Sequence, residues 1–232
     1  MNTTTPRPIP LALTALIALA ALAALAVSNG TAAHAHGNGS HEAHTHAASA
    51  AVSRKELVLR GEMRRLWEDH IVWTRLAIIS LTTGSPDTEA TVGRLLRNQA
   101  DIGDAIRPFY GRAAGNALTE LLRGHILIAA DLIAAAKAGD QPALADAQAR
   151  WERNADDIAA FLNRANPRHW KLAALQHMLE EHLTLTTAEA VARLRGDWAA
   201  DVAAYDRIHR HALGMADQLS TGLVRQFPRR FR

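Results

Sequence analysis

The chain has 232 residues, enough for one sizeable core, and 48% of them are hydrophobic while only 5% are aromatic. A net charge of +3 without a dense basic stripe argues against a nucleic-acid partner. The lack of cysteine excludes a disulfide framework, a lipid-attachment cysteine and a covalent c-type haem site. Alanine, leucine and arginine are abundant and no alternating strand pattern occurs, so the composition favours an all-α fold.

Residues 1–35 have the pattern of a signal peptide. Arg7 gives a positive start, an apolar run follows, and the sequence AHA at 33–35 is a small-residue cleavage signal. The apolar run is short for a bilayer span and is followed by polar sequence. We therefore expect an exported protein, periplasmic or secreted, with no stable membrane span after cleavage.

A histidine-rich segment follows over residues 36–52. Glycine, serine, asparagine and alanine separate the histidines and cannot pack a core, so we expect a flexible arm. Neutral imidazoles at this density bind Cu(II), Ni(II) or Zn(II). The arm is therefore a candidate metal chelator, and the alternative is a soluble spacer whose metal affinity is incidental. Its candidate ligands are His36, His41, His44 and His46.

Six helices are predicted after the arm. Pro108 and Pro167 mark helix ends, and short glycine turns separate the other helices. Because short turns make neighbouring helices antiparallel, we predict one all-α domain over 53–228, a six-helix bundle of three repeated helical hairpins. The hairpins are 53–110, 115–165 and 171–226, and their helices are 53–83, 87–110, 115–138, 141–165, 171–195 and 198–226.

The three hairpins share a pattern. In each one a histidine lies fourteen residues before a glycine, in the pairs His70–Gly84, His125–Gly139 and His182–Gly196. The returning helices share the form Arg, apolar, any residue, Arg, then Asn or His, in RLLRN (94–98), RWERN (150–154) and RIHRH (207–211). Apolar residues follow four and eight positions later in all three. This agreement predicts an internal repeat.

The repeat predicts a polar layer inside the bundle. Fourteen helical residues rise about 21 Å, so the chain climbs to the turn and then descends by a similar distance. The Asn or His that closes each returning motif should therefore lie level with the opening histidine. We expect six residues in one layer: His70 with Asn98, His125 with Asn154, and His182 with His211.

This layer has two interpretations. In the structural one, asparagine satisfies the buried imidazoles and the layer fixes the register of the helices. In the functional one, histidines from several helices bind a metal, with Cu or Zn as the candidates and His209 as an alternative to His211. Additional ligands or supporting carboxylates would be Glu68, Glu180, Glu181 and Asp206.

Charged residues near the layer are expected to form ion pairs. We place Arg75 against Asp101 or Asp104. Three arginines beside the layer are expected to form ion pairs with acidic residues at the bundle end. The arginines are Arg97, Arg153 and Arg210, and the acidic residues are Glu68, Asp69, Glu180 and Glu181.

Catalytic motifs are lacking in this sequence. No serine or cysteine stands in a nucleophile elbow, and no glycine-rich loop leads into Lys-Ser or Lys-Thr. The Glu-x-x-His pair of di-iron bundles does not occur in the predicted helices. The sequence therefore favours a binding protein over an enzyme, and a purely structural envelope protein remains a third class.

The stretches LWEDHIVWTRLAIIS, RLLRNQADIGDAI, HILIAADLIAAAKAGD and RWERNADDIAAFLNRANP resemble an uncharacterised family of exported bacterial helical proteins. Members of that family are often labelled glycosyltransferase or acetylglutamate kinase. The resemblance covers nearly all of 54–228, implies a single family domain and keeps a glycosyltransferase-like enzyme as the alternative function. It supplies no catalytic residue, and this chain has Gly124 where similar proteins have an acidic or longer residue. The matching positions are Trp67, His70, Trp73, Arg75, Asn98, Asp101, His125, Asn154, Asp156 and His182.

Overall fold

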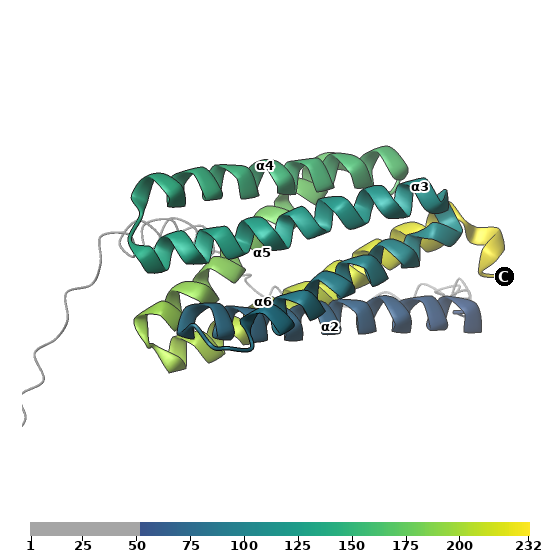
Figure 1. The fold of residues 1–232 in the computed structure, drawn as a ribbon. Coiled ribbons are helices and arrows are strands. Elements are labelled where there is room, and N and C mark those ends of the chain that lie inside the picture. Colours follow the sequence, from purple (N-terminus) through teal and green to yellow (C-terminus); the bar gives the residue numbers. More distant parts are fainter. Residues whose placement is uncertain (1–51) are drawn as a thin grey trace, which may run out of the picture.

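The computed structural model describes residues 52–232, which form a bundle of long helices (Figure 1). No strand occurs in this range, so the prediction of an all-α fold is confirmed. The predicted signal peptide and the arm histidines His36, His41, His44 and His46 lie outside the described residues. The elements are α2 (Arg54–Thr83), α3 (Thr88–Ala138), α4 (Gln141–Ala165), α5 (Leu172–Arg195), α6 (Trp198–Gln226) and the 3-10 turn η1 (Pro228–Arg230).

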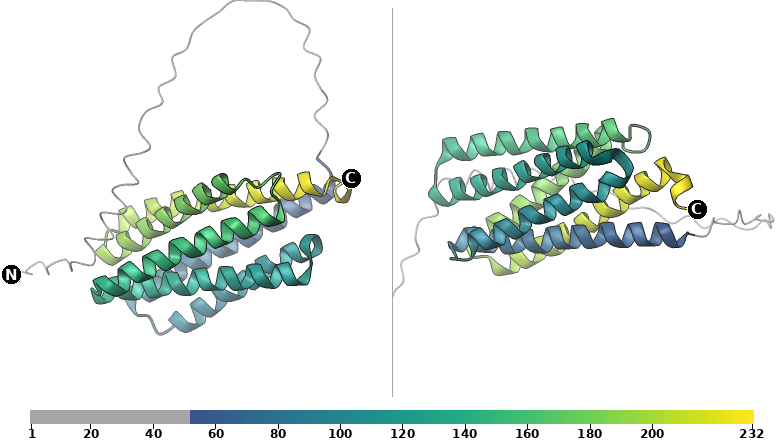
Figure 2. Two further views of the ribbon diagram at one scale, coloured as in Figure 1. Left: turned by 90° about the horizontal axis from the view of Figure 1, so that it is seen from above. Right: turned by 45° about the vertical axis from the view of Figure 1, so that its right-hand side comes forward.

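Helix α3 is bent at Gly111, whose backbone has φ 85° and ψ 170°. The chain turns back there, and its two halves run along the bundle in different directions (Figure 2). We expected a longer connection over 111–114, but only Gly111 leaves the helical conformation. Among the described residues there are consequently five α-helices, one of them bent, in place of six separate ones.

The two halves of α3 approach each other closely at two glycines. A Cβ atom added to Gly103 would lie 2.6 Å from the carbonyl oxygen of Gly115 and 2.0 Å from Oγ1 of Thr119. Such distances leave no room for a side chain, so glycine is required at this crossing.

The three glycine turns end their helices as predicted. Gly84, Gly139 and Gly196 have φ of 71°, 77° and 70°, the left-handed conformation that closes a helix. Asp140 and Asp197 then begin the next helices, and each side chain accepts a hydrogen bond of 3.0 Å from the backbone N–H three residues later. All three turns lie at the same end of the bundle, on the left in Figure 1; we call it the turn end.

The core runs along the bundle between the helices. Its opposite end is closed by Trp170, which is 2% exposed and lies against Gly222. The ring of Tyr110, next to the bend in α3, has its centre 6.2 Å from that of Trp170. None of the helices in 52–232 combines the length and apolar character needed to cross a membrane.

Candidate functional site: a buried histidine layer

Four imidazoles from four helices meet inside the bundle. They belong to His70 on α2, His125 on α3, His182 on α5 and His211 on α6. The ring centre of His182 lies 5.9 Å from that of His70, 6.1 Å from His125 and 6.0 Å from His211. The four candidate ligands are therefore gathered into one place, with His182 at the centre; we call this group the histidine layer.

The residues that close the three returning motifs make the same kind of contact. Asn98 Nδ2 donates to the carbonyl of Leu66, and Asn154 Nδ2 donates to the carbonyl of Leu121, both at 3.0 Å. His211 Nε2 bonds the carbonyl of Met178, also at 3.0 Å. Each carbonyl belongs to the residue four positions before the opening histidine. The layer therefore joins neighbouring helices through one repeated side-chain-to-backbone bond.

Of the predicted pairs of histidine with asparagine, His125 and Asn154 form a direct hydrogen bond, and His70 lies beside both Asn98 and Gln99. His125 Nδ1 lies 2.8 Å from Asn154 Oδ1, so the imidazole donates from Nδ1. His70 Nδ1 instead accepts from Nε2 of Gln99 at 3.2 Å. The Oδ1 of Asn98 accepts from the same Gln99 nitrogen at 3.1 Å, so Asn98 belongs to the same contact. Gln99 follows His70 by 29 residues, the spacing of the other two pairs, and that spacing could have identified it.

His182 differs from the histidines around it. Its Nδ1 is buried and has no hydrogen-bond partner. Its backbone carbonyl accepts a bond of 2.8 Å from Oγ1 of Thr186, as expected for a threonine within a helix. An unpaired buried polar atom costs about 1–3 kcal/mol. His182 is the most buried of the four histidines, and the lone pair or the proton on its Nδ1 is therefore not used in any hydrogen bond.

Burial keeps the layer uncharged. Removal from water lowers the pKa of His70 and of His125 to about 4. The pKa of His182 is lowered further by burial and by the neighbouring imidazoles, and the pKa of His211 is lowered mainly by burial. At neutral pH all four are therefore neutral imidazoles, the form that binds transition metals.

Carboxylates are few around the layer. Glu181 Oε2 lies 3.4 Å from His211 Nδ1. Glu68 instead pairs with His209 at 2.9 Å at the surface, so His209 is not a member of the layer. Within the described part of the chain, no group of three or more His, Asp or Glu side chains is arranged to hold a metal ion as it stands.

An apolar cavity of about 60 Å³ lies in the core below the layer, on the side away from the turn end. Its walls carry no charged residue. They include the apolar residues found four and eight positions after each returning motif, which are Ile102, Ile106, Ile158, Leu162, Met215 and Leu219. The sequence repeat therefore continues from the polar layer into the walls of this cavity.

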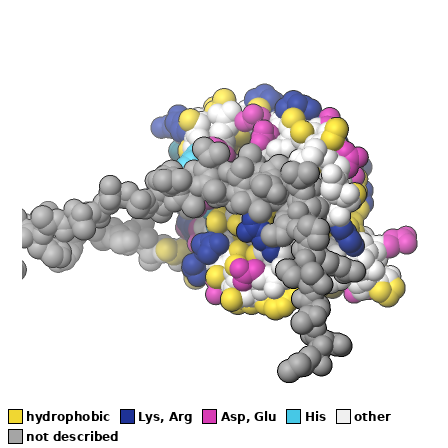
Figure 3. Space-filling view, turned by 90° about the vertical axis from the view of Figure 1, so that its left-hand side faces the viewer, with side chains coloured by type: hydrophobic (Ala, Val, Ile, Leu, Met, Phe, Trp, Pro, Cys, Tyr) yellow, Lys and Arg dark blue, Asp and Glu magenta, His cyan; other side chains and the backbone are white. Residues whose placement is uncertain are grey.

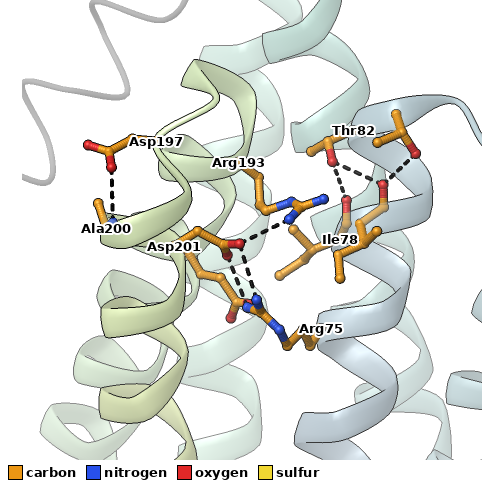
Figure 4. Close-up of polar contacts among 10 residues, drawn as sticks. Arg75, Ile78, Thr82, Arg193, Asp197, Ala200 and Asp201 are labelled. Carbon is orange, nitrogen blue, oxygen red and sulfur yellow. Dashed lines mark hydrogen bonds and ion pairs between the residues drawn. The ribbon is translucent and has the colours of Figure 1, made fainter.

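Charged side chains from α2, α5 and α6 meet near the turn end, where Figure 4 shows Arg75 and Arg193 directed at Asp201. Arg75 donates to both oxygens of Asp201 at 3.0 and 3.1 Å and to Oε1 of Glu189 at 2.7 Å. Arg193 adds a bond of 3.0 Å to Asp201. We call these four residues the Arg75 cluster. The prediction that Arg75 pairs with Asp101 or Asp104 is wrong, because the residues that face it come from α5 and α6.

The two carboxylates of the Arg75 cluster are each 1% exposed. Burial raises the pKa of Glu189 to about 7, although Arg75 opposes that shift. The guanidinium of Arg75 also lies 4.6 Å from the ring centre of Tyr205. The turn end beyond the cluster has positive and negative side chains interspersed where it is open to view (Figure 3).

The expected ion pairs of the three motif arginines are not found. Within residues 52–232, Arg97, Arg153 and Arg210 make no ion pair within 4.0 Å. Asp69 is bound instead by Arg65 and Arg94, each at 3.4 Å.

Comparison with known proteins gives no relative from which a role could be carried over. No protein-family model, no curated protein and no solved structure matches the chain. The resemblance drawn from the sequence motifs stays a prediction.

Proposed function

We propose that this chain is an exported helical binding protein that holds a transition-metal ion, Cu or Zn, at the histidine layer. The observation that carries the proposal is His182. Its unpaired, buried Nδ1 lies among three other imidazoles whose ring centres are 5.9–6.1 Å away. A metal ion would give that nitrogen the partner it lacks.

The spacing of the rings supports this role. Imidazoles bound to one tetrahedral ion through bonds of about 2.0–2.1 Å have ring centres roughly 5 Å apart. The separations from His182 are somewhat longer than that, so the rings would have to rotate and approach one another to direct nitrogens at a common point. The rotations are required, because the side chains as they stand do not form a metal-binding group. The uncharged state of the four rings favours coordination, since no imidazolium has to lose its charge first.

The proposal also includes the repeated hairpins that carry the layer and the export of the chain. We take the unit of the fold to be a repeated hairpin, over 53–110, 115–165 and 171–226, with α3 serving as two helices. The equal bonds of 3.0 Å to the carbonyls of Leu66, Leu121 and Met178 support it. Export follows from the pattern of residues 1–35, and the histidines of the arm would be an auxiliary chelator.

The test uses the full chain with its arm histidines removed, so that the arm cannot bind the ion. The background variant replaces His34, His36, His41, His44 and His46 with alanine. We expect about one equivalent of Zn(II), Cu(II) or Cu(I) to be retained after desalting and to raise the unfolding temperature. His182→Leu should remove both effects while circular dichroism stays helical, and His209→Ala, at the surface, should change neither. Absence of a bound ion, or one that persists in His182→Leu, would contradict the proposal.

A structural role for the layer is the second candidate, favoured by Asn98 and Asn154, which already satisfy backbone carbonyls. In that case the layer fixes the register of the helices and no ion is bound. The same measurements separate the two roles, because only the metal-binding role predicts a stoichiometric ion.

A further inference from the structure

A cleft of about 490 Å³ opens at the turn end, between the last turns of α2, α3 and α5 and the first residue of α6. Pockets that bind small molecules commonly have volumes of this size. Its lining includes two hydroxyls, three cationic side chains and one indole, and among the described residues no acidic side chain lines it. The residues that give it this character are Thr82, Thr83, Lys137, Arg193, Arg195 and Trp198.

The cations of this cleft are only partly used within the protein. Lys137 Nζ donates to the carbonyl of Leu81 at 3.1 Å, and one nitrogen of Arg193 donates to Asp201 at 3.0 Å. The Nε of Arg193 is buried and has no hydrogen-bond partner. Arg195 is exposed and forms no ion pair within 4.0 Å in residues 52–232. The cleft therefore keeps positive charge that its own neighbours do not neutralise.

The carboxylates that begin the next helices are used as helix caps. Asp197 accepts from the backbone N–H of Ala200 at 3.0 Å, and Figure 4 shows its side chain directed away from Arg193. Asp140 caps α4 in the same way. Each glycine turn also joins the negative end of one helix to the positive start of the next, so the helix dipoles largely cancel at this end. The side chains that line the cleft therefore decide its charge.

Trp198 adds a flat apolar surface at the edge of the cleft. The guanidinium of Arg193 lies 4.8 Å from the centre of a Trp198 ring, a cation–π contact that fixes the indole in place. The residue is nevertheless 58% exposed, unlike Trp67, Trp151 and Trp170, which are buried. Aromatic groups pack well on an indole held in this way.

We propose that this cleft binds a small organic anion, whose carboxylate or phosphate group is held by Arg195 and Lys137 and whose flat apolar part lies against Trp198. A guanidinium can bind either kind of group through two parallel hydrogen bonds, and Lys137 and Arg193 add positive charge beside it. The site is separate from the histidine layer. Arg193 follows His182 by eleven residues on α5, a rise of about 16 Å, so this inference does not depend on a bound metal.

The experiment titrates the isotope-labelled full chain at low ionic strength with benzoate, phenyl phosphate, benzamide and acetate, and follows the indole N–H signals by NMR. The chain has five tryptophans, and the signal that is lost in Trp198→Phe belongs to Trp198. We expect benzoate or phenyl phosphate to shift that signal saturably, and the tighter of the two identifies the anionic group. Benzamide, which is uncharged, and acetate, which has no ring, should bind at least about tenfold more weakly.

Arg195→Gln should weaken binding of the anion at least about tenfold, because it removes a charge-assisted hydrogen bond. It leaves the Arg75 cluster intact, so the fold should be unchanged. The matched control is Arg112→Gln, an exposed arginine beside the bend of α3 at the opposite end, which should bind as the parent does. Added salt should weaken binding by screening.

Three results would overturn this inference. They are a Trp198 signal that no anion shifts, benzamide that binds as tightly as benzoate, and Arg195→Gln that binds as the parent does. Acetate that binds as tightly as benzoate would overturn the role of Trp198. None of these results bears on the histidine layer, whose own test replaces His182, so the two proposals fail independently.

Discussion

The histidine layer and the Arg75 cluster are two buried polar regions of one bundle that compensate for burial in opposite ways. The layer is neutral, and its members bond to backbone carbonyls and amide side chains. The cluster instead pairs opposite charges from α2, α5 and α6, although Oε2 of Glu189 and Nε of Arg193 have no hydrogen-bond partner. Arg75 is only five residues beyond His70 on the same helix. Burial disfavours charge in both regions, and the Arg75 cluster differs because other helices bring opposite charges that offset this penalty.

Lowering the pH should reduce the free energy of unfolding through the histidine layer, and this is the largest change in stability that we expect. The folded protein lowers the pKa of His70 and His125 from 6.5 to about 4, so the unfolded chain binds protons first as the pH falls. Stability conferred by neutral imidazoles is complete above pH 6.5 and decreases between pH 6.5 and 4. The loss should be on the order of 3 kcal/mol for each of the two histidines.

This dependence can be measured by urea unfolding of the metal-free protein at several pH values. The slope of the unfolding free energy against pH should be smaller in His182→Leu, which has one imidazole fewer to protonate. A free energy that stays constant from pH 7 to 4.5 would mean that the layer is not held neutral by burial.

In the Arg75 cluster, Asp201→Ala should cost about 3 kcal/mol, because it leaves the half-buried guanidinium groups of Arg75 and Arg193 without their shared acceptor. The matched control is Asp217→Ala. Asp217 pairs with Arg64 at 2.8 Å, but the side chains are 45% and 48% exposed, so the control should cost at most about 1 kcal/mol. Equal losses in the two variants would show that the cluster is no stronger than a surface ion pair.

Asn154→Ala should have an intermediate effect, about 1–3 kcal/mol. It removes the acceptor for His125 Nδ1 and the donor to the carbonyl of Leu121. Asn116→Ala, which removes an exposed bond from Arg107, is the control and should have little effect on the denaturation midpoint. A neutral result for Asn154→Ala would remove hydrogen bonding as the reason that the layer tolerates burial.

The smallest expected change in stability is that of His182→Leu without metal. Because the Nδ1 of His182 has no partner, replacing the ring with an apolar side chain of similar volume should leave the free energy of unfolding unchanged or raise it slightly. Thermal and urea unfolding would measure it. A large destabilisation would mean that His182 is a structural member of the layer, as Asn154 is.

Much of the fold could be predicted because it depends on spacing along the chain. The glycine turns and the level of His125 with Asn154 follow from counting residues on a helix. The partners of Arg75 could not be predicted, because Glu189 and Asp201 reach it only through the packing of α5 and α6 against α2. Gln99 was not predicted, for a different reason. The motif that ends at Asn98 lies one residue closer to its histidine than the other two motifs do, so alignment on the motif selects Asn98 and passes over Gln99.

The close contact of Gly103 with Gly115 has a consequence for how the chain can be rearranged. It joins the halves of α3 by direct backbone packing, whereas Gly111 between them is exposed and has open space around its α-carbon. The covalent link at Gly111 is therefore not what holds the halves together. A circular permutant whose new termini lie at Gly111 should still fold. Gly103→Ala, which adds a single methyl group, should push the two halves of α3 apart.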